Sequence, residues 1–217
     1  MFVLIGSPAS GKGTQAMILS SRFRIPHIST GDLIRDEIKH QTARGALFSK
    51  DVNQGKFPPD KLILDILYER ISKPDCKSGF ILDGFPRTKE QAKLLEKYSK
   101  LLAVRPIVIH IDVSDAVVID RIVNRVICCN CNAPYHLINN PPKKEGICDF
   151  CGSPVTKRTD DSVDVIKNRL ELYHEKTEPL FKFYQKKERF FRVDGSVAKD
   201  QVTAQINSIL EQTQATV

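Results

Sequence analysis

A phosphate-binding loop is indicated by nine residues near the start of the chain, Gly-Ser-Pro-Ala-Ser-Gly-Lys-Gly-Thr at positions 6–14. The loop follows an apolar run at 2–5 and precedes a segment with helical character. The spacing Gly-x4-Gly-Lys between a strand and a helix lets successive backbone N–H groups surround an anion, to which Lys12 adds a positive charge. The hydroxyl that usually follows the lysine comes one residue later, at Thr14, because Gly13 intervenes.

A metal site is predicted by two pairs of cysteines, Cys128-x2-Cys131 and Cys148-x2-Cys151, with sixteen residues between the pairs. This spacing is typical of tetrahedral four-cysteine zinc sites, in which each tight turn supplies two thiolates. Four protein ligands leave no position for an activated water, so we expect a structural Zn²⁺. Cys129 would leave only one residue between itself and Cys131, and we exclude it from the ligand set.

An acidic residue and an arginine follow a second apolar run. Asp83 comes directly after residues 79–82, where we expect the carboxyl end of a core strand, and Arg87 lies four residues further on. A carboxylate at such a strand end can hold Mg²⁺ or its waters in a phosphate-loop enzyme, and the planar guanidinium of arginine matches a phosphate. The two residues therefore indicate phosphate chemistry in combination with Lys12.

Further arginines lie at both ends of the cysteine-containing segment. Arg121 and Arg125 are four residues apart, which predicts that they share one helix face at its entrance, and Arg158 lies at its exit. Phosphoryl transfer needs such cations more than it needs a base, because a phosphate nucleophile is already ionised. The sequence shows no convincing general base and no Ser/His/Asp set, and we interpret His110 as a core histidine.

Apolar strand-like runs alternate with helical patterns along the chain, which predicts an α/β fold with a parallel sheet covered on both faces. One helix is expected over 62–71, after Pro58-Pro59, and another over 163–173, with Ser162 as its N-cap. Two stretches, 30–58 and 121–158, break the alternation and are interpreted as insertions on the rim of the sheet. The expected strands lie near 2–6, 25–29, 79–83, 106–112 and 190–194.

The composition excludes several classes of protein. The 217 residues are 41% hydrophobic and 27% charged, as in an ordinary globular domain. The apolar runs are far shorter than the ~20 residues of a membrane helix, and no signal peptide is recognisable, so we expect a cytoplasmic protein with no membrane contact. In a reducing compartment the six cysteines favour metal binding or free thiols. The net charge of +7 favours a polyanionic partner, which a nucleotide satisfies as well as a nucleic acid.

The chain resembles the adenylate kinase family over almost its whole length. The intervening Gly13 is the form that this family uses, and the cysteine segment is similar to the zinc-bearing version of the family's long lid. The motifs that show the resemblance, in the family's order, are 6–15, Ser29-Thr30-Gly31-Asp32 with Arg35, Asp83-Gly84-Phe85-Pro86-Arg87 with Gln91, Arg121 and Arg125, Arg158-x-Asp160-Asp161, and Arg169.

The resemblance implies a three-layer P-loop NTPase-like core with two rim insertions. The core would comprise 1–29, 59–120 and 159–217. Residues 30–58, named the clamp below, would bind AMP, and residues 121–158, named the lid, would hold Zn²⁺. The implied partners of a monomeric enzyme are ATP, AMP and ADP, with Mg²⁺ bound together with ATP and no membrane or nucleic acid involved.

The resemblance also implies roles for individual residues. Arg125 and Arg169 would contact the transferred phosphoryl group, Asp83 would orient hydrated Mg²⁺, and the Gln91 amide would read the adenine edge. The implied catalytic residues are Lys12, Asp83, Arg87, Arg125, Arg158 and Arg169. The implied ATP-binding residues are Ala9, Ser10, Gly11, Lys12, Gly13, Thr14, Arg121, Tyr135 and His136. The implied AMP-binding residues are Thr30, Arg35, Gly84, Arg87 and Gln91.

Some positions depart from the family's pattern or remain to be tested. Ala9 stands where a third loop glycine is common, which matters if that position requires a positive φ. Asn132 and Pro134 alter the lid turn after the first pair of cysteines. The peptide bond before Pro86 is expected to be cis by the same analogy.

Two alternative functions stay open from the sequence. A UMP or CMP kinase is the nearest, although the long lid and Gln91 count against it. A zinc-ribbon nucleic-acid-binding protein is a different class. Residues 121–158 contain six Lys and Arg against two Asp and Glu, but their only aromatic residues are Tyr135 and Phe150, a poor platform for stacking bases.

Overall fold

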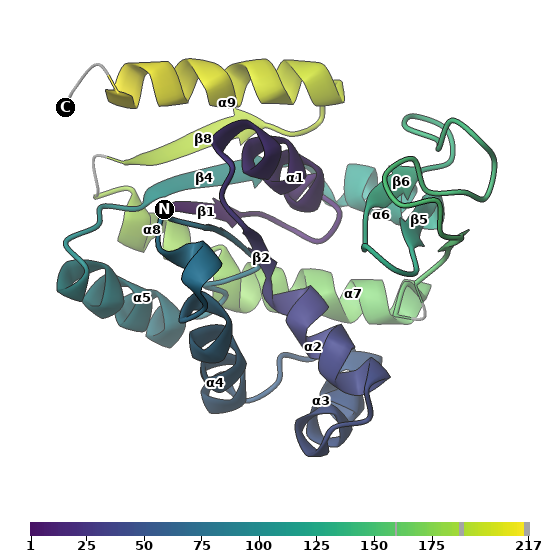
Figure 1. Cartoon of the computed structure of the whole chain (residues 1–217), viewed down its shortest axis with the longest axis horizontal. Coiled ribbons are helices and arrows are strands. Elements are labelled where there is room, and N and C mark those ends of the chain that lie inside the picture. The colour runs from purple at the N-terminus through teal and green to yellow at the C-terminus, as the bar shows by residue number, and fades with distance from the viewer. Residues whose placement is uncertain (159, 187–188, 215–217) are drawn as a thin grey trace.

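A five-stranded parallel sheet forms the centre of the molecule (Figure 1). The computed structural model describes residues 1–158, 160–186 and 189–214. The strand order is β2-β3-β1-β4-β8, so β1 lies in the middle and the chain leaves it first toward one edge of the sheet and later toward the other. The strands of this sheet are β1 (Phe2–Ile5), β2 (His27–Ser29), β3 (Ile81–Asp83), β4 (Ile107–Asp112) and β8 (Phe190–Asp194).

Helices cover both faces of the sheet, as predicted. The α-helices are α1 (Lys12–Phe23), α2 (Thr30–Lys39), α3 (Ala43–Asn53), α4 (Asp60–Ile71), α5 (Lys89–Leu101), α6 (Asp115–Val123), α7 (Val163–Leu172), α8 (Leu180–Tyr184) and α9 (Lys199–Gln214). A short 3-10 turn, η1 (Pro74–Cys76), precedes β3, and a π-helical turn, η2 (Tyr173–Thr177), follows α7.

The alternation of side chains along β1 divides the core into two layers. Val3 and Ile5 belong to an apolar cluster with residues of α4, α5 and α8, whereas Leu4 belongs to a second cluster with residues of α1 and α9. Successive side chains of a strand point to opposite faces, so each strand contributes to both clusters. Figure 1 shows α1 and α9 on one side of the sheet and α4, α5 and α8 on the other. The predicted three-layer α/β core is confirmed.

The predicted strands are all present, but four of them are shorter than expected. The second strand begins at His27 rather than at residue 25, because Pro26 has no N–H group for the ladder. Its carbonyl still accepts a hydrogen bond from Ile81 N at 2.9 Å. The first strand ends at Ile5, and the strands expected from 79 and 106 begin at Ile81 and Ile107.

The clamp and the lid project from the carboxyl edge of the sheet. The clamp contains α2 and α3. The lid contains an antiparallel sheet of order β6-β5-β7, formed by β5 (Arg125–Cys128), β6 (Pro134–His136) and β7 (Val155–Thr156). Lys39 Nζ at the end of α2 donates to the Cys129 carbonyl at 3.4 Å, so the two insertions are in contact.

The prediction that Arg121 and Arg125 share a helix face is wrong. Helix α6 ends at Val123 with Asn124 as its C-cap, and Arg125 is the first residue of β5. The β-branched residues that follow, Val126 and Ile127, pair with β6 and favour the strand.

The two helices that the sequence predicts are confirmed. α4 begins directly after Pro59, and Ser162 caps α7 by accepting a hydrogen bond from Val165 N at 3.4 Å. Helical structure then continues beyond the predicted end through η2, whose wide turn is closed by Glu178 N donating to the Tyr173 carbonyl at 2.8 Å. Within the described parts of the chain, no helix has the length and apolar character that crossing a membrane requires.

Candidate functional site

The loop between β1 and α1 is shaped to surround an anion. Gly11, at φ 101°, is the residue before α1, so the free N–H groups of the first helical turn face the loop. A Cβ atom on Gly6 would lie 2.4 Å from the Ile111 carbonyl oxygen, and only glycine fits there. Ala9 has φ 53°, which shows that the position where a glycine is common does require a left-handed backbone.

Lys12 folds back over this loop. Its ammonium donates to the carbonyls of Gly6 at 2.9 Å and Ser7 at 2.6 Å, and to Ser10 Oγ at 3.2 Å. Burial is the largest of the effects that lower the pKa of Lys12 to about 8, and the nearby charges of Arg87 and Arg125 act in the same direction. Asp83 opposes them. The hydrogen bonds are satisfied, but the positive charge of the ammonium is only partly neutralised until an anion enters the loop.

Asp83 at the end of β3 faces the phosphate loop. A Cβ atom on Gly13 would lie 3.5 Å from Asp83 Oδ2, and His27 Nε2 lies 3.2 Å from the same oxygen. Burial opposes the charge of Asp83, but His27 and Lys12 outweigh it and lower the pKa of the carboxyl. Burial likewise opposes protonation of His27, yet the hydrogen bond and charge of Asp83 raise its pKa. An ionised carboxylate beside the loop suits a hydrated Mg²⁺.

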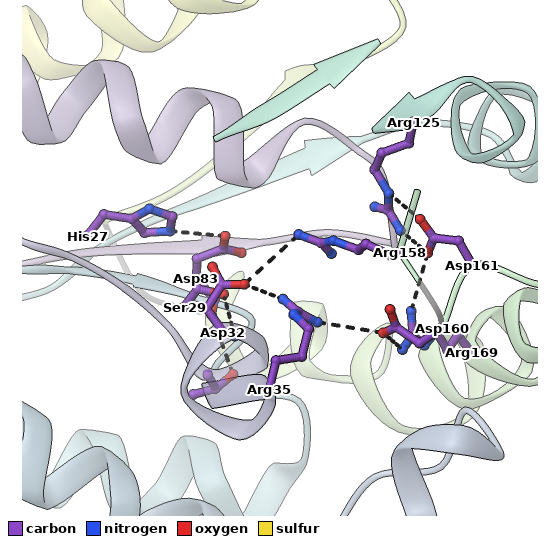
Figure 2. Close-up of polar contacts among 11 residues, drawn as sticks. His27, Ser29, Asp32, Arg35, Asp83, Arg125, Arg158, Asp160, Asp161 and Arg169 are labelled. Carbon is purple, nitrogen blue, oxygen red and sulfur yellow. Dashed lines mark hydrogen bonds and ion pairs between the residues drawn. The ribbon is translucent and has the colours of Figure 1, made fainter. Parts of the chain in front are cut away.

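A chain of arginine–aspartate pairs links the clamp, the lid exit and α7 (Figure 2). Arg35 of α2 pairs with Asp32 and lies 3.6 Å from Asp160 Oδ2. Arg169 of α7 pairs with the same Asp160 oxygen, while Arg158 of the lid lies 4.0 Å from Asp32. Segments distant in the sequence are thus joined through their charges.

Asp160 and Asp161 follow the exit of the lid and accept the charges of several of these arginines. Asp160 is buried, which opposes its charge, but Arg169 and Arg35 hold the pKa of the carboxyl well below its usual range. Asp161 accepts a hydrogen bond from Arg125 Nε at 2.8 Å. The arginines are therefore held in place by carboxylates before any phosphate binds.

Arg121 has a different set of partners. Its guanidinium donates to the carbonyls of Ala9 and Ser10 at 3.4 and 3.3 Å, and to the Gly195 carbonyl at 2.6 Å. It connects the phosphate loop with the segment between β8 and α9.

Arg87 follows the cis bond between Phe85 and Pro86, which confirms that expectation. Arg87 Nε donates to the Gly84 carbonyl at 2.7 Å. Burial, followed by the charge of Arg169, lowers the pKa of Arg87 to about 10. Among the described residues, Arg87 has no carboxylate at ion-pairing distance.

Thr30 and Gln91 lie behind this loop rather than on the surface of the cavity. The Thr30 hydroxyl donates to the Gly84 carbonyl at 2.9 Å. Gln91, only 1% exposed, accepts from Arg87 N at 2.7 Å through Oε1 and donates to Asp60 Oδ1 at 2.5 Å through Nε2. Because a backbone N–H only donates and a carboxylate only accepts, these partners fix the orientation of the amide.

The four cysteines of the lid converge, as the spacing predicts. Their sulfur atoms all lie within 4.8 Å of one another, and Cys128 Sγ is 3.4 Å from Cys151 Sγ. The sulfurs of a zinc tetrahedron with Zn–S bonds of about 2.3 Å are about 3.8 Å apart, so the cluster fits the metal. Cys148 Sγ accepts hydrogen bonds from Tyr135 Oη and Phe150 N, both at 3.4 Å, which stabilise a thiolate.

His136 presents a single donor atom at the lid. Its Nδ1 accepts hydrogen bonds from Ile138 N at 3.2 Å and Asn139 N at 3.0 Å, so a neutral ring has its proton on Nε2. Within the part of the chain that the structure describes, this buried Nε2 has no partner.

These groups surround one cavity of about 750 Å³ between the sheet edge, the clamp and the lid. The cavity is lined by most of the site residues that the sequence predicted. The exceptions are Thr30, Gln91 and three of the four cysteines predicted to bind metal. The predicted residues that line the cavity are Ala9, Ser10, Gly11, Lys12, Gly13, Thr14, Arg35, Asp83, Gly84, Arg87, Arg121, Arg125, Tyr135, His136, Arg158 and Arg169.

Several lining residues were missed by the sequence analysis. Phe57 lies near the end of the clamp, and its position before two prolines is the only signal that could have singled it out. Lys199 lies at the start of α9 and donates to Asn140 Oδ1 of the lid at 3.1 Å. His27 was without an expected partner until the structure placed it against Asp83.

The phosphate loop after the central strand, with the cavity at the carboxyl edge of a parallel sheet, defines the class of P-loop proteins that bind nucleotide phosphates. A family model described as adenylate kinase matches residues 4–189. The chain belongs to the adenylate kinase family.

Curated relatives agree with this assignment over nearly full length. An adenylate kinase of Clostridium acetobutylicum is 46% identical over 211 residues, which cover 96% of this chain and 97% of the relative. An adenylate kinase of Methanocella arvoryzae is 43% identical over 214 residues, with 96% and 97% covered. One of Caldicellulosiruptor bescii is 46% identical over 186 residues, with 85% and 86% covered.

Proposed function

We propose that this chain catalyses the reversible, Mg²⁺-dependent transfer of the γ-phosphoryl group of ATP to AMP, giving two ADP. The observation that supports this best is the convergence of Lys12 and the arginine–aspartate chain on one cavity between two insertions. In the forward step the bond between the γ-phosphorus and the bridging oxygen breaks, and a bond to an AMP phosphate oxygen forms. That oxygen is already ionised, so no general base is required.

The ATP phosphates bind in the loop formed by residues 9–14 in this proposal. Backbone N–H groups and Lys12 neutralise their charge, and Arg121 holds the loop through the carbonyls of Ala9 and Ser10. Tyr135 and His136 line the nucleoside end, where His136 Nε2–H is available as a donor. Bound Mg²⁺ supplies charge neutralisation at the phosphates, and Asp83 is the carboxylate that orients its waters.

The AMP phosphate lies between Arg35 and Arg87 in this assignment, and Arg125, Arg158 and Arg169 contact the group in transit. Each of these cations lines the cavity. Thr30 acts through Gly84, which it holds by a hydrogen bond. Beyond its hydrogen bonds with Arg87 N and Asp60 Oδ1, Gln91 retains one N–H and one oxygen lone pair, a donor–acceptor pair that matches the edge of adenine.

The lid is proposed to hold one structural Zn²⁺ and to close over ATP. Four thiolates complete the tetrahedron, so the metal stabilises the lid and takes no part in the chemical step. Closure excludes water that would otherwise compete for the phosphoryl group. Fluorophores on the lid and the core should come closer when an analogue spanning both nucleotide sites binds, and an unchanged distance at saturation would contradict the proposed closure.

A panel of nucleoside monophosphates with ATP as donor tests the proposed reaction. We expect AMP to be the preferred acceptor and Lys12→Met to lower turnover by ~10²-fold or more, because the ammonium acts mainly in the transition state. Circular dichroism and thermal unfolding serve as the folding control for this variant. Equal use of UMP or CMP would favour the related kinases instead, and full activity of Lys12→Met would refute the assignment.

We propose that the protein is cytoplasmic, binds no nucleic acid and acts as a monomer. The monomer is supported by the cavity of a single chain, which is lined by the cations assigned to both substrates. Light scattering that gave the mass of two chains would contradict the monomer. Salt-dependent binding of single-stranded DNA or RNA would contradict the absence of nucleic acid.

A further inference from the structure

Arg87 differs from the neighbouring arginines in how its charge is compensated. Arg35 and Arg169 pair with aspartates, whereas Arg87 makes no ion pair within the described parts of the chain. Its side chain donates one hydrogen bond, from Nε to the Gly84 carbonyl at 2.7 Å. Burial and the charges of Arg169 and Arg35 lower the pKa of Arg87. The charges of Asp83 and Asp160, which lie beyond ion-pairing distance, offset this only in part, so a further contact can stabilise the guanidinium.

The ring of Phe57 supplies that support. The central carbon of the Arg87 guanidinium lies over this ring, 5.2 Å from its centroid. This distance is within the range of a cation–π interaction, in which the negative face of the ring attracts the cation. Phe57 comes from the end of the clamp, whereas Arg87 comes from the loop between β3 and α5, so the contact joins two separate segments of the site.

The segment before Phe57 is anchored to α7, and this anchoring restricts the position of the Phe57 ring. Asn168 Nδ2 donates to the Gln54 carbonyl at 3.0 Å. Gly55 has φ 70°, and a Cβ atom there would lie 2.7 Å from the Val165 carbonyl oxygen, so the backbone approaches α7 closely. After Phe57, the buried Pro58 restricts the chain where it leaves the clamp.

A ring and a carboxylate would affect phosphate binding in different ways. A carboxylate accepts hydrogen bonds from the edge of a guanidinium, the same N–H groups that form a paired contact with phosphate. An aromatic ring interacts with the flat face and leaves those edge donors free. Phe57 can therefore orient Arg87 without competing with the substrate.

We propose that Phe57 is a positioning residue, which holds the Arg87 guanidinium by a cation–π contact with its edge turned toward the acceptor phosphate. The inference rests on the proposed function for the identity of the acceptor. The contact between Phe57 and Arg87 does not depend on it.

The test compares Phe57→Leu, which keeps an apolar side chain and removes the ring face, with Phe57→Tyr, which keeps the ring. We expect Phe57→Leu to weaken AMP binding, measured calorimetrically, by about 3- to 30-fold, the range of a partly desolvated cation–π interaction. ATP binding should change by less than about twofold, and Phe57→Tyr should restore AMP binding. Unchanged AMP binding in Phe57→Leu, or an equal loss in Phe57→Tyr, would overturn the proposal.

A double-mutant cycle separates support of Arg87 from direct contact with the nucleotide. In an Arg87→Ala background, Phe57→Leu should no longer alter the affinity for AMP, because the group that the ring supports is absent. An effect of full size in that background would show that Phe57 touches AMP itself and would overturn the proposal. Thermal unfolding verifies that each variant is folded, and Phe57→Met is the replacement if Phe57→Leu is not. Failure of the proposed function is a separate result, an unaltered protein that binds AMP but transfers no phosphoryl group.

Discussion

Lys12 should take up a proton when ATP binds at mildly alkaline pH. Burial, with the charges of Arg87 and Arg125, lowers the pKa of Lys12 to about 8 in the empty site. The triphosphate places negative charge beside the ammonium and raises this pKa again. At pH 6 the ammonium is charged both in the empty site and with ATP bound, so Lys12 takes up no proton. Near pH 8 about half of the empty molecules hold a neutral Lys12, so binding takes up about half a proton.

Isothermal titration calorimetry in two buffers of different ionisation enthalpy measures this uptake directly. Lys12→Arg is the matched control, because a guanidinium keeps its charge at every pH used, and subtracting its signal removes the titration of ATP and of other side chains. The affinity of the unaltered protein should also fall as the pH rises above 8, by at most about tenfold per pH unit. Equal proton uptake by the unaltered protein and Lys12→Arg at pH 8, with both binding ATP, would refute the reasoning.

Three further predictions concern the lid, the acceptor site and the carboxylate beside the phosphate loop. Metal analysis of protein purified without chelator should give about one Zn²⁺ per chain, and Cys148→Ser should lose it and unfold at a lower temperature; a metal-free lid in the unaltered protein would contradict this. Gln91→Ala should raise KM for AMP about tenfold or more and leave KM for ATP unchanged, because the variant cannot form the two hydrogen bonds to adenine that we propose; equal effects on both substrates would assign Gln91 a general structural role. The pair of His27 and Asp83 should stabilise the fold most between about pH 4 and 6.5, where both groups are charged. The pKa of His27 is raised, so its contribution is lost as the pH rises through that value, whereas the pKa of Asp83 is lowered, so its contribution is lost as the pH falls through that value. Urea unfolding of the unaltered protein and His27→Asn should therefore differ more at pH 5 than at pH 8, and a constant difference would count against the pair.

The parts of the site that could be predicted from the sequence are those in which neighbouring residues act together. Residues 9–14 are assigned to phosphate through consecutive N–H groups, so their spacing alone predicts the loop. Each pair of lid cysteines offers two thiolates from one turn, as the spacing predicts. The close approach of the two pairs is seen only in the structure. The resemblance to a known family supplied the roles of the individual arginines, because each arginine taken singly looks no different in the sequence from a surface charge.

The parts that could not be predicted depend on contacts between distant segments. Asp160 pairs with Arg169 and lies near Arg35 of the clamp, and no periodicity in the sequence indicates that meeting. The error at Arg125 has a local cause, because a spacing of four residues was extended through Asn124, where α6 ends. Gln91 was expected at the cavity, but Asp60, which fixes its amide, is a partner that only the structure reveals.

The backbone at Ala9 has a consequence for how ordered the empty loop is. An alanine at φ 53° costs on the order of 1 kcal/mol relative to glycine in the folded state. The same methyl group removes conformations from the unfolded chain and from any disordered form of the loop, which glycine would leave accessible. A loop with fewer alternatives loses less conformational entropy when a phosphate enters. With Ala9, the loop loses part of its conformational entropy when the protein folds and not when the phosphate binds. A small local strain thus lowers the entropic penalty of each catalytic cycle.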